Sequence, residues 1–271
     1  MFFSSNPPIH SWKNKIVWII GASSGIGAAL ASLLAQNGAH LVLSARSVDK
    51  LNDVARTCDA FSTFHSLILP CDIHSEEEIH STYQKIKQQH HAIDLVIIAS
   101  GTYDALSIRE FNPQQLSTVI NTIDTNLTGY YRVISYVIPD FLKNGKGGLA
   151  MISSVAGFSG LPNALAYAPT KAALNNLAEG LYAELHPHQI GIYIVCPGFV
   201  ATPMTANNRF PMPALIEVDQ AAQAIISGLE KGQFEIHFPK RFTLFLQFLR
   251  RLPRSWYIKI ISYFFHKNSI L

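Results

Sequence analysis

A glycine-rich loop after an apolar segment constrains the fold of this chain more than any other feature. Residues 15–20 form an apolar run of strand length, residues 21–27 read Gly-Ala-Ser-Ser-Gly-Ile-Gly, and residues 28–37 have a helix-forming composition. In the order strand, loop and helix, glycines let the backbone approach a phosphate, and the helix N-terminus supplies amide donors. The order therefore predicts a dinucleotide-binding loop, although an ordinary turn between a strand and a helix would show the same order.

The residues of this loop have separate expected roles. Gly21 permits a tight exit from the strand, Gly25 lets the backbone approach the pyrophosphate, and Gly27 lets the helix and the strand pack closely. The predicted phosphate-binding residues are Gly21, Ser23, Ser24, Gly25, Ile26 and Gly27. Their spacing is G-x-x-x-G-x-G, which differs from the commonest dinucleotide fingerprint, G-x-G-x-x-G.

The end of the second expected strand indicates which nicotinamide cofactor the loop binds. Residues 40–44 form a mostly apolar run, and Ala45, Arg46 and Ser47 follow it. An acidic residue at this strand end would bind the ribose hydroxyls of NAD, and none is present. Arg46 can instead bind a ribose 2′-phosphate through two hydrogen bonds. We therefore predict NADP(H), bound here by Arg46 and Ser47; a solvated arginine at the start of the next helix is the alternative.

Runs of strand length alternate with helical segments along the chain. Strands are expected at residues 15–20, 40–44, 67–73, 94–98, 149–152, 190–196 and 234–238, and helices at residues 28–37, from 75, 112–141, from 164 and 219–229. This alternation predicts a parallel sheet covered by helices on both faces, which is a doubly wound, three-layer α/β fold. We expect one catalytic domain over residues 1–239, followed by an extension over residues 240–271 that is not an independent domain.

Candidate catalytic residues follow the fifth expected strand. Ser154 comes directly after it, and Tyr167 and Lys171 stand four residues apart on the helix expected from residue 164, which places them on one face. A lysine ammonium beside a phenol favours the phenolate, which would bring proton exchange closer to neutral pH. A nearby serine hydroxyl could bind the oxygen that is reduced or oxidised. These residue types predict a site for proton transfer.

The Tyr-x-x-x-Lys spacing alone is weak evidence, because it also begins at Tyr83 and at Tyr263. Only Tyr167 has a serine thirteen residues before it, namely Ser154 at a strand end. A helix tyrosine that packs beside a solvated lysine is the alternative.

Asn126 lies inside the long helix expected over residues 112–141, which should bend near Thr128 and Gly129. Asparagine has a poor helix propensity. Either Asn126 bonds its own backbone at the bend, or the bend frees a carbonyl that holds water near Lys171.

Taken in order, the motifs resemble the short-chain dehydrogenase/reductase family of the classical type. The residues that carry the resemblance are the glycine loop, Asp72, Asn126, Ser154, Tyr167 with Lys171, and Pro197-Gly198 with Thr202. They span about residues 15–238, most of the chain, and are specific because they occur together. The resemblance implies a Rossmann fold with seven parallel strands and an oxidoreductase that acts on CH-OH groups through an Asn-Ser-Tyr-Lys tetrad.

The resemblance also implies a role for each residue of the tetrad. Tyr167 is the proton donor in reduction, and Ser154 holds the substrate carbonyl. Lys171 binds the nicotinamide ribose and lowers the pKa of the tyrosine, while Asn126 positions water in a proton relay. The cofactor-binding residues expected beyond the loop and the second strand are Asp72, Ile73, Ala99, Gly101, Tyr167, Lys171, Pro197, Gly198, Val200 and Thr202. Asp72 either accepts from the adenine amino group or caps a turn.

One motif departs from the family pattern. At the end of the fourth strand the family usually shows Asn-Asn-Ala-Gly, and this chain has Ile98-Ala99-Ser100-Gly101. Ala99 and Gly101 keep the floor of the cofactor site small. The asparagine that normally ties neighbouring strands is missing, so we expect a weaker connection there.

Charge and cysteine content exclude several classes of protein. Seven basic residues and no acidic residue follow Glu235, so the other fourteen basic and eighteen acidic residues give residues 1–235 a net charge of −4. An acidic body does not suit a nucleic-acid-binding protein. Three cysteines and scattered histidines suggest neither a disulfide framework nor a metal site. With no secretory signal at the N-terminus, the chain is expected in the cytoplasm.

The C-terminal extension contains two apolar runs, residues 242–249 and 256–265, separated by a basic segment. Each is shorter than the roughly 20 residues that span a bilayer. Two helices that lie on an anionic membrane surface fit this pattern. A packed extension that covers the substrate pocket or a subunit interface fits it equally.

The sequence therefore predicts an NADP(H)-dependent oxidoreductase. Hydride would pass between the nicotinamide and a small-molecule ketone, aldehyde or secondary alcohol, which could be lipid-like. The alternative is a non-catalytic NADP(H)-binding sensor or membrane-recruited scaffold on the same fold. By analogy with the family, a homodimer or homotetramer is expected.

Overall fold

A computed structural model describes residues 5–62, 64–106, 108–109, 111–206, 208 and 211–268, with only the backbone described for residues 264–268. The strands are β1 (Ile16–Ile20), β2 (His40–Ser44), β3 (Leu67–Ile68), β4 (Leu95–Ile98), β5 (Gly148–Ile152), β6 (Gly191–Pro197) and β7 (Glu235–Phe238). The α-helices are α1 (Gly25–Gln36), α2 (Val48–Asp59), α3 (Glu76–Gln89), α4 (Leu116–Ile123), α5 (Gly129–Asn144), α6 (Tyr167–Leu185), α7 (Val218–Glu230), α8 (Lys240–Arg251) and α9 (Arg254–Asn268).

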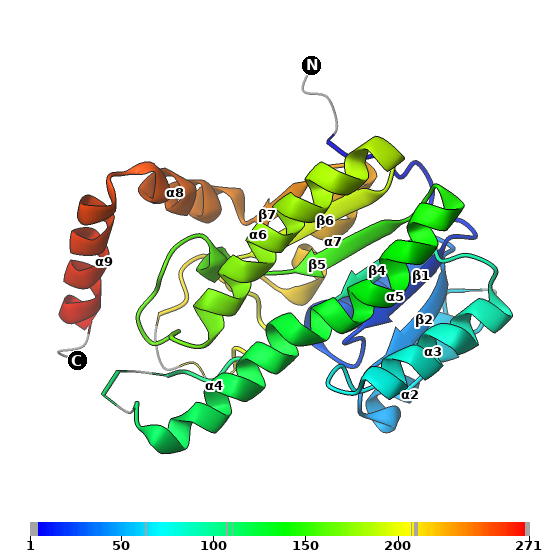
Figure 1. Cartoon of the computed structure of the whole chain (residues 1–271), viewed down its shortest axis with the longest axis horizontal. Helices are drawn as coiled ribbons and strands as arrows, with labels where there is room; N and C mark the ends of the chain where they lie inside the picture. Colours follow the sequence, from blue (N-terminus) through cyan, green and yellow to red (C-terminus); the bar gives the residue numbers. More distant parts are fainter. Residues whose placement is uncertain are drawn as a thin grey trace.

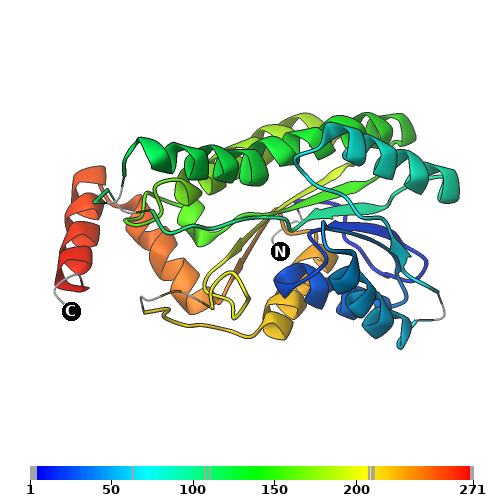
Figure 2. The same cartoon turned by 90° about the horizontal axis from the view of Figure 1, so that it is seen from below.

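The strands form one parallel sheet in the order β3-β2-β1-β4-β5-β6-β7. Helices α1, α2 and α7 cover one face, and α3, α5 and α6 cover the other (Figure 2). The chain changes direction across the sheet between β1 and β4, and in such sheets ligands bind at the carboxyl ends of the strands beside this point. The doubly wound, three-layer fold that was predicted is confirmed.

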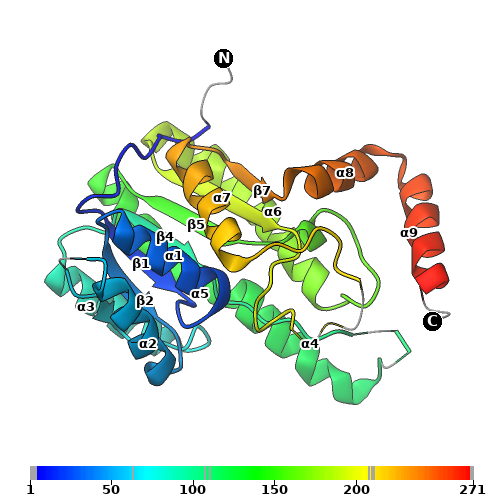
Figure 3. The same cartoon turned by 180° about the vertical axis from the view of Figure 1, so that it is seen from behind.

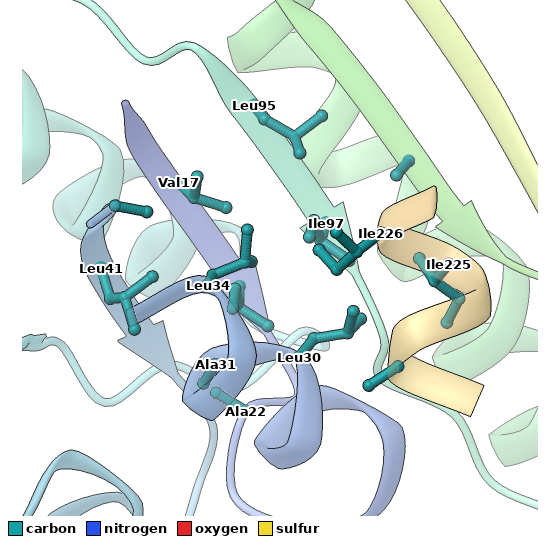
Figure 4. Packing of buried hydrophobic residues seen from close by; sticks show 14 of the residues in the cluster. Val17, Ala22, Leu30, Ala31, Leu34, Leu41, Leu95, Ile97, Ile225 and Ile226 are labelled. Carbon is teal, nitrogen blue, oxygen red and sulfur yellow. The ribbon is translucent and has the colours of Figure 1, made fainter. Parts of the chain in front are cut away.

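Side chains of β1 show why its sequence is apolar without interruption. Val17 and Ile19 belong to the core on one face, whereas Trp18 and Ile20 belong to the core on the other. All four are at most 1% exposed. Figure 4 shows the first core, in which Val17 lies with Leu30 and Leu34 of α1 and Ile225 and Ile226 of α7. A strand that is covered on both faces needs apolar residues at every position.

Several elements differ in extent from the prediction. β3 ends at Ile68, although the amides of Leu69 and Cys71 still donate to carbonyls of the β2 segment. The helix expected from residue 164 begins at Tyr167. Between α4 and α5 a π-helical turn, Asp124–Thr128, interrupts the long helix, which places the predicted irregularity around Asn126.

The extension consists of α8 and α9, which follow β7 directly. Both helices project from one end of the molecule, and α9 stands farthest from the sheet (Figures 1 and 3). Among the described residues, no helix is long and apolar enough to cross a membrane.

Candidate active site

The predicted site residues meet in one cavity of about 420 Å³ at the carboxyl ends of the strands. Its walls include Gly21, Ser23, Ser24, Gly25, Ile26, Gly27, Arg46, Ser47, Asp72, Ile73, Ala99, Gly101, Ser154, Tyr167, Lys171, Pro197, Gly198, Val200 and Thr202. Of the predicted residues, only Asn126 does not line it. Segments far apart in the sequence therefore form one continuous site.

The glycine loop forms one wall, and its backbone could not hold larger residues. Gly21 and Gly25 have φ angles of +90° and +54°, a conformation that other residues rarely adopt. A Cβ atom on Gly27 would lie 2.2 Å from the carbonyl oxygen of Gly21. The N-cap of α1, Ser24, uses no side-chain hydrogen bond to cap this helix. The backbone thus forms a cradle with amide donors at a helix N-terminus, which fits a pyrophosphate.

Cations gather at the end of the cavity beside β2. Arg46 and Lys50 both line it and are exposed to solvent. Ser47 is the N-cap of α2, and its hydroxyl accepts a hydrogen bond from the amide of Lys50. This end presents two cations and a second helix N-terminus, an arrangement that fits an additional phosphate.

Asp72 and His74 form a turn on the neighbouring wall. The Asp72 carboxylate accepts a hydrogen bond of 3.0 Å from the amide of His74, so it caps this turn while it also lines the cavity. The His74 ring nitrogen Nε2 lies 2.7 Å from the Thr125 hydroxyl, which connects the turn to the π-helical segment. Turn capping and a contact with the cofactor are therefore compatible for Asp72.

Tyr167 lies at the first turn of α6, with its hydroxyl hydrogen-bonded to Ser154. Burial raises the pKa of the Tyr167 phenol to about 12, and the hydrogen bond with Ser154 lowers it only in part. The predicted shift of this pKa toward neutral pH was wrong for this structure. The physical reason is that burial removes the phenolate from water, and this effect outweighs the hydrogen bond with Ser154.

Lys171 is only 3% exposed, and its ammonium lies between two phenol rings. Its Nζ is 5.5 Å from the ring centre of Tyr167 and 5.7 Å from that of Tyr130. The ammonium donates a hydrogen bond of 2.8 Å to the carbonyl oxygen of Ile152 at the end of β5. Burial lowers the pKa of Lys171 to about 7, so this group gains and loses a proton near neutral pH.

Asn126 is fully buried behind the cavity wall. Its side-chain oxygen accepts from the amide of Thr102 at 2.8 Å, and its side-chain nitrogen donates to the carbonyl of Thr102 at 2.9 Å. The amide thus bonds the backbone of a distant segment and not its own, unlike one of the two interpretations of the sequence. Asn126 fixes the loop that follows Gly101, beside Lys171.

A tyrosine takes the place of the missing strand connection at the end of β4. The Tyr130 hydroxyl lies 2.9 Å from the carbonyl oxygen of Ser100 and 3.1 Å from those of Ile98 and Ile152. Tyr130 is fully buried, so this phenol is the group that joins the ends of β4 and β5. It also holds the same Ile152 carbonyl that Lys171 binds.

We expect Tyr130→Phe to lower the free energy of unfolding by about 1–3 kcal/mol, because the substitution removes the one hydroxyl proton that three buried carbonyl oxygens face. Turnover should also fall, since the carbonyl that orients Lys171 loses a partner. Urea denaturation and steady-state kinetics measure both effects. Tyr193→Phe is the matched control: Tyr193 is also buried, and its hydroxyl donates to the Pro7 carbonyl, away from the cavity, so stability should fall without loss of turnover. Wild-type stability and turnover in Tyr130→Phe would contradict this role.

Sequence reasoning missed several residues of the cavity. Lys50 was detectable as a second cation, because it stands only four residues after Arg46 in the sequence. His74 and Met204 carry no sequence signal, since loops bring them to the wall. Of the two other Tyr-x-x-x-Lys matches, Lys87 forms an ion pair of 2.9 Å with Asp140 away from the cavity, and the side chain of Lys267 lies outside the described residues.

Comparisons with known proteins agree with this geometry. A family model described as short chain dehydrogenase matches residues 15–212. An uncharacterized oxidoreductase of Myxococcus xanthus is 28% identical over 235 residues, which cover 87% of this chain and 91% of that protein. A short chain dehydrogenase of Burkholderia cenocepacia, solved in complex with NADP, has a TM-score of 0.79 at 23% identity and covers 93% of this chain and 99% of its own. A short-chain dehydrogenase of Sphingobium yanoikuyae, solved with NADPH, has a TM-score of 0.76 at 25% identity, with coverage of 89% and 97%.

Proposed function

This chain belongs to the short-chain dehydrogenase family, and we propose that it is an NADP(H)-dependent carbonyl reductase or alcohol dehydrogenase. The observation that carries the proposal is that Ser154, Tyr167 and Lys171 share one cavity with the glycine loop. A proton-transfer group thus stands in the same space as a dinucleotide cradle. The substrate is a ketone, an aldehyde or a secondary alcohol.

The nicotinamide cofactor supplies or accepts the hydride, and the residues of the chain bind the substrate and move the proton. Ser154 donates a hydrogen bond to the substrate oxygen and thereby holds it at the phenol of Tyr167. Because burial raises the pKa of Tyr167, the phenol keeps its proton at neutral pH, which is the state that a donor needs in the reduction direction. Lys171, with a pKa of about 7, can return a proton to the site after each turnover.

NADP(H) is the proposed cofactor, and the charge at the end of β2 supports it. Arg46, Lys50 and the N-terminus of α2 face the cavity there, and no carboxylate directly follows this strand. A ribose 2′-phosphate would gain contacts with both cations, whereas the two free hydroxyls of NAD(H) would find no acceptor of the usual kind.

Arg46→Ala is expected to reduce the preference for NADPH over NADH by about 10–100-fold, because a hydrogen-bonded charge pair with the 2′-phosphate contributes about 1.5–3 kcal/mol. The ratio of dissociation constants for the two nucleotides, measured by fluorescence titration, tests this. Arg56→Ala, on the helix α2 that follows Arg46, is the control, since Arg56 is exposed and pairs with Asp53. An unchanged ratio in Arg46→Ala would refute the phosphate role.

The reaction class is tested by NADPH oxidation with a panel of ketones and aldehydes of increasing chain length. Turnover that depends on the carbonyl substrate supports the proposal, and the chain length with the highest rate identifies the substrate class. Tight NADPH binding without turnover of any compound would favour a non-catalytic sensor.

In this proposal the chain consists of a catalytic domain over residues 1–239 and the extension, and it acts as a homodimer or homotetramer. Large apolar side chains along α4 support an oligomer: Leu116, Ile120 and Ile123 are 53%, 58% and 41% exposed. Light scattering after size-exclusion chromatography distinguishes these states from a monomer.

A further inference from the structure

The outer face of α8 exposes large apolar side chains. Leu244, Phe245 and Phe248 are 53%, 54% and 61% exposed, and they form one stripe because they stand three and four residues apart. Arg241 and Arg251 stand at the two ends of this stripe. The opposite face packs on the body through Thr243 and Leu249, among others, so the outward direction of the stripe is fixed.

The helix α9, which follows α8, also exposes large side chains. Trp256, Ile258 and Tyr263 are 62%, 55% and 63% exposed. The Tyr257 hydroxyl donates a hydrogen bond of 2.9 Å to the carbonyl of Gly160, which joins α9 to the loop after Ser154. Trp and Tyr side chains with an apolar body and a polar tip are typical of membrane interfaces.

Cations accompany the apolar side chains, and no acid does. The extension has seven basic residues and no acidic one. Arg241, Arg251, Arg254 and Lys259 are exposed, and within the described part of the chain no ion pair involves them. Such cations remain available to an external anionic surface.

The same charges disfavour a second copy of this chain as the partner. In a two-fold symmetric interface each surface meets its own copy, so the basic helices would face each other. Like charges that are brought together at an interface weaken it. An anionic lipid surface satisfies both the cations and the exposed aromatic side chains.

The extension lies beside the mouth of the candidate active site. Phe242 of α8 packs on Phe199, with ring centres 5.9 Å apart, and Phe199 lies between the cavity residues Gly198 and Val200. Exposed apolar side chains continue near the site at Leu165, Met204 and Leu215. In Figures 1 and 3, α8 and α9 project from this end of the molecule.

We propose that α8 and α9 dock on the surface of an anionic lipid bilayer, with the mouth of the cavity toward the lipid. The helices lie on the surface, since over their described residues neither is long and apolar enough to span a bilayer. A second step rests on the function proposed above: the carbonyl or alcohol substrate is a long-chain lipid that enters from the bilayer. The docking itself does not depend on catalysis.

Cosedimentation of the full-length protein with vesicles tests the docking. Binding is expected to vesicles of phosphatidylcholine with phosphatidylserine, to be weak with phosphatidylcholine alone, and to fall as salt is raised. Arg251→Gln with Arg254→Gln should lower the partition coefficient by about 30-fold, since each interfacial cation contributes roughly a fivefold factor. Lys143→Gln with Lys146→Gln removes the same charge from the exposed end of α5 and should change nothing.

The apolar contribution is tested separately. Phe245→Ser with Phe248→Ser should lower binding by about tenfold or more, whereas Phe61→Ser, at another exposed phenylalanine, should not. Circular dichroism and NADPH affinity show that each variant is folded. Failure of the wild-type protein to bind anionic vesicles overturns the docking. It is also overturned if the phenylalanine pair dissociates an oligomer and leaves vesicle binding intact, because a second copy then covers this face.

Measurements of turnover distinguish docking on the bilayer from delivery of a lipid substrate. With a long-chain ketone in anionic vesicles, the arginine pair should lose turnover in proportion to binding, while turnover of a short water-soluble aldehyde stays unchanged. Vesicle binding with equal loss of both activities overturns the lipid-delivery step. Vesicle binding without turnover of any carbonyl overturns the proposed function and leaves the docking supported.

Discussion

Tyr167→Phe is expected to lower turnover by about 10³-fold while the affinity for NADPH stays within about twofold of the wild type, since general acid catalysis contributes about 10²–10⁴-fold. The substitution removes one oxygen atom from a ring that otherwise keeps its packing against Tyr103, where the ring centres are 5.1 Å apart. Because the phenol is the proposed proton donor and the glycine loop forms the proposed cofactor cradle, catalysis and binding should separate. Lys171 should keep its place in the variant, since its ammonium donates a hydrogen bond to the Ile152 carbonyl.

Steady-state NADPH oxidation and NADPH titration, both with the same preparation, measure the two quantities. Tyr83→Phe is the matched control, because Tyr83 has the same Tyr-x-x-x-Lys spacing on α3 and lies outside the cavity. Its turnover should equal that of the wild type. A Tyr167→Phe enzyme with most of its activity would remove this residue from the mechanism, and equal loss of NADPH affinity would assign it to cofactor binding instead.

The fold was predictable because its signals are local and repeated. Each central strand of a sheet covered on both faces must be apolar throughout, and β1, β4 and β6 all show this in the sequence. Parallel strands then bring their carboxyl ends to one edge, which is why residues from 21 to 202 could be assigned to one site before the structure was considered.

Two features of the site could not be predicted, because they depend on which side chains the fold buries together. The missing asparagine after β4 was visible in the sequence, but the contact found there was not, because Tyr130 reaches the carbonyls at the ends of β4 and β5 from a helix on the face of the sheet. The predicted direction of the Tyr167 pKa shift was wrong for a similar reason. Spacing places Lys171 near the phenol, but it does not show how deeply the phenol is buried, and burial raises the pKa of Tyr167.

Gly27→Ala is expected to lower the free energy of unfolding by about 3 kcal/mol and to abolish NADPH binding at concentrations that saturate the wild type. The added Cβ would lie 2.2 Å from the carbonyl oxygen and 2.9 Å from the carbonyl carbon of Gly21. Gly21 cannot move away, because a Cβ at its own position would already lie 2.5 Å from the backbone nitrogen of Ser100. The loop is therefore packed from both sides by backbone, which does not shift as a flexible side chain does.

Gly180→Ala provides the matched control for this substitution. Gly180 lies on the exposed side of α6, and a Cβ there would meet no heavy atom within 4 Å. The free energy of unfolding should rise by about 0.5–1 kcal/mol, because alanine loses less backbone entropy than glycine in a helix. Urea denaturation and NADPH titration of both variants make the comparison. If Gly27→Ala matched Gly180→Ala in stability and NADPH affinity, the loop would be an ordinary turn and the cofactor would have to bind elsewhere.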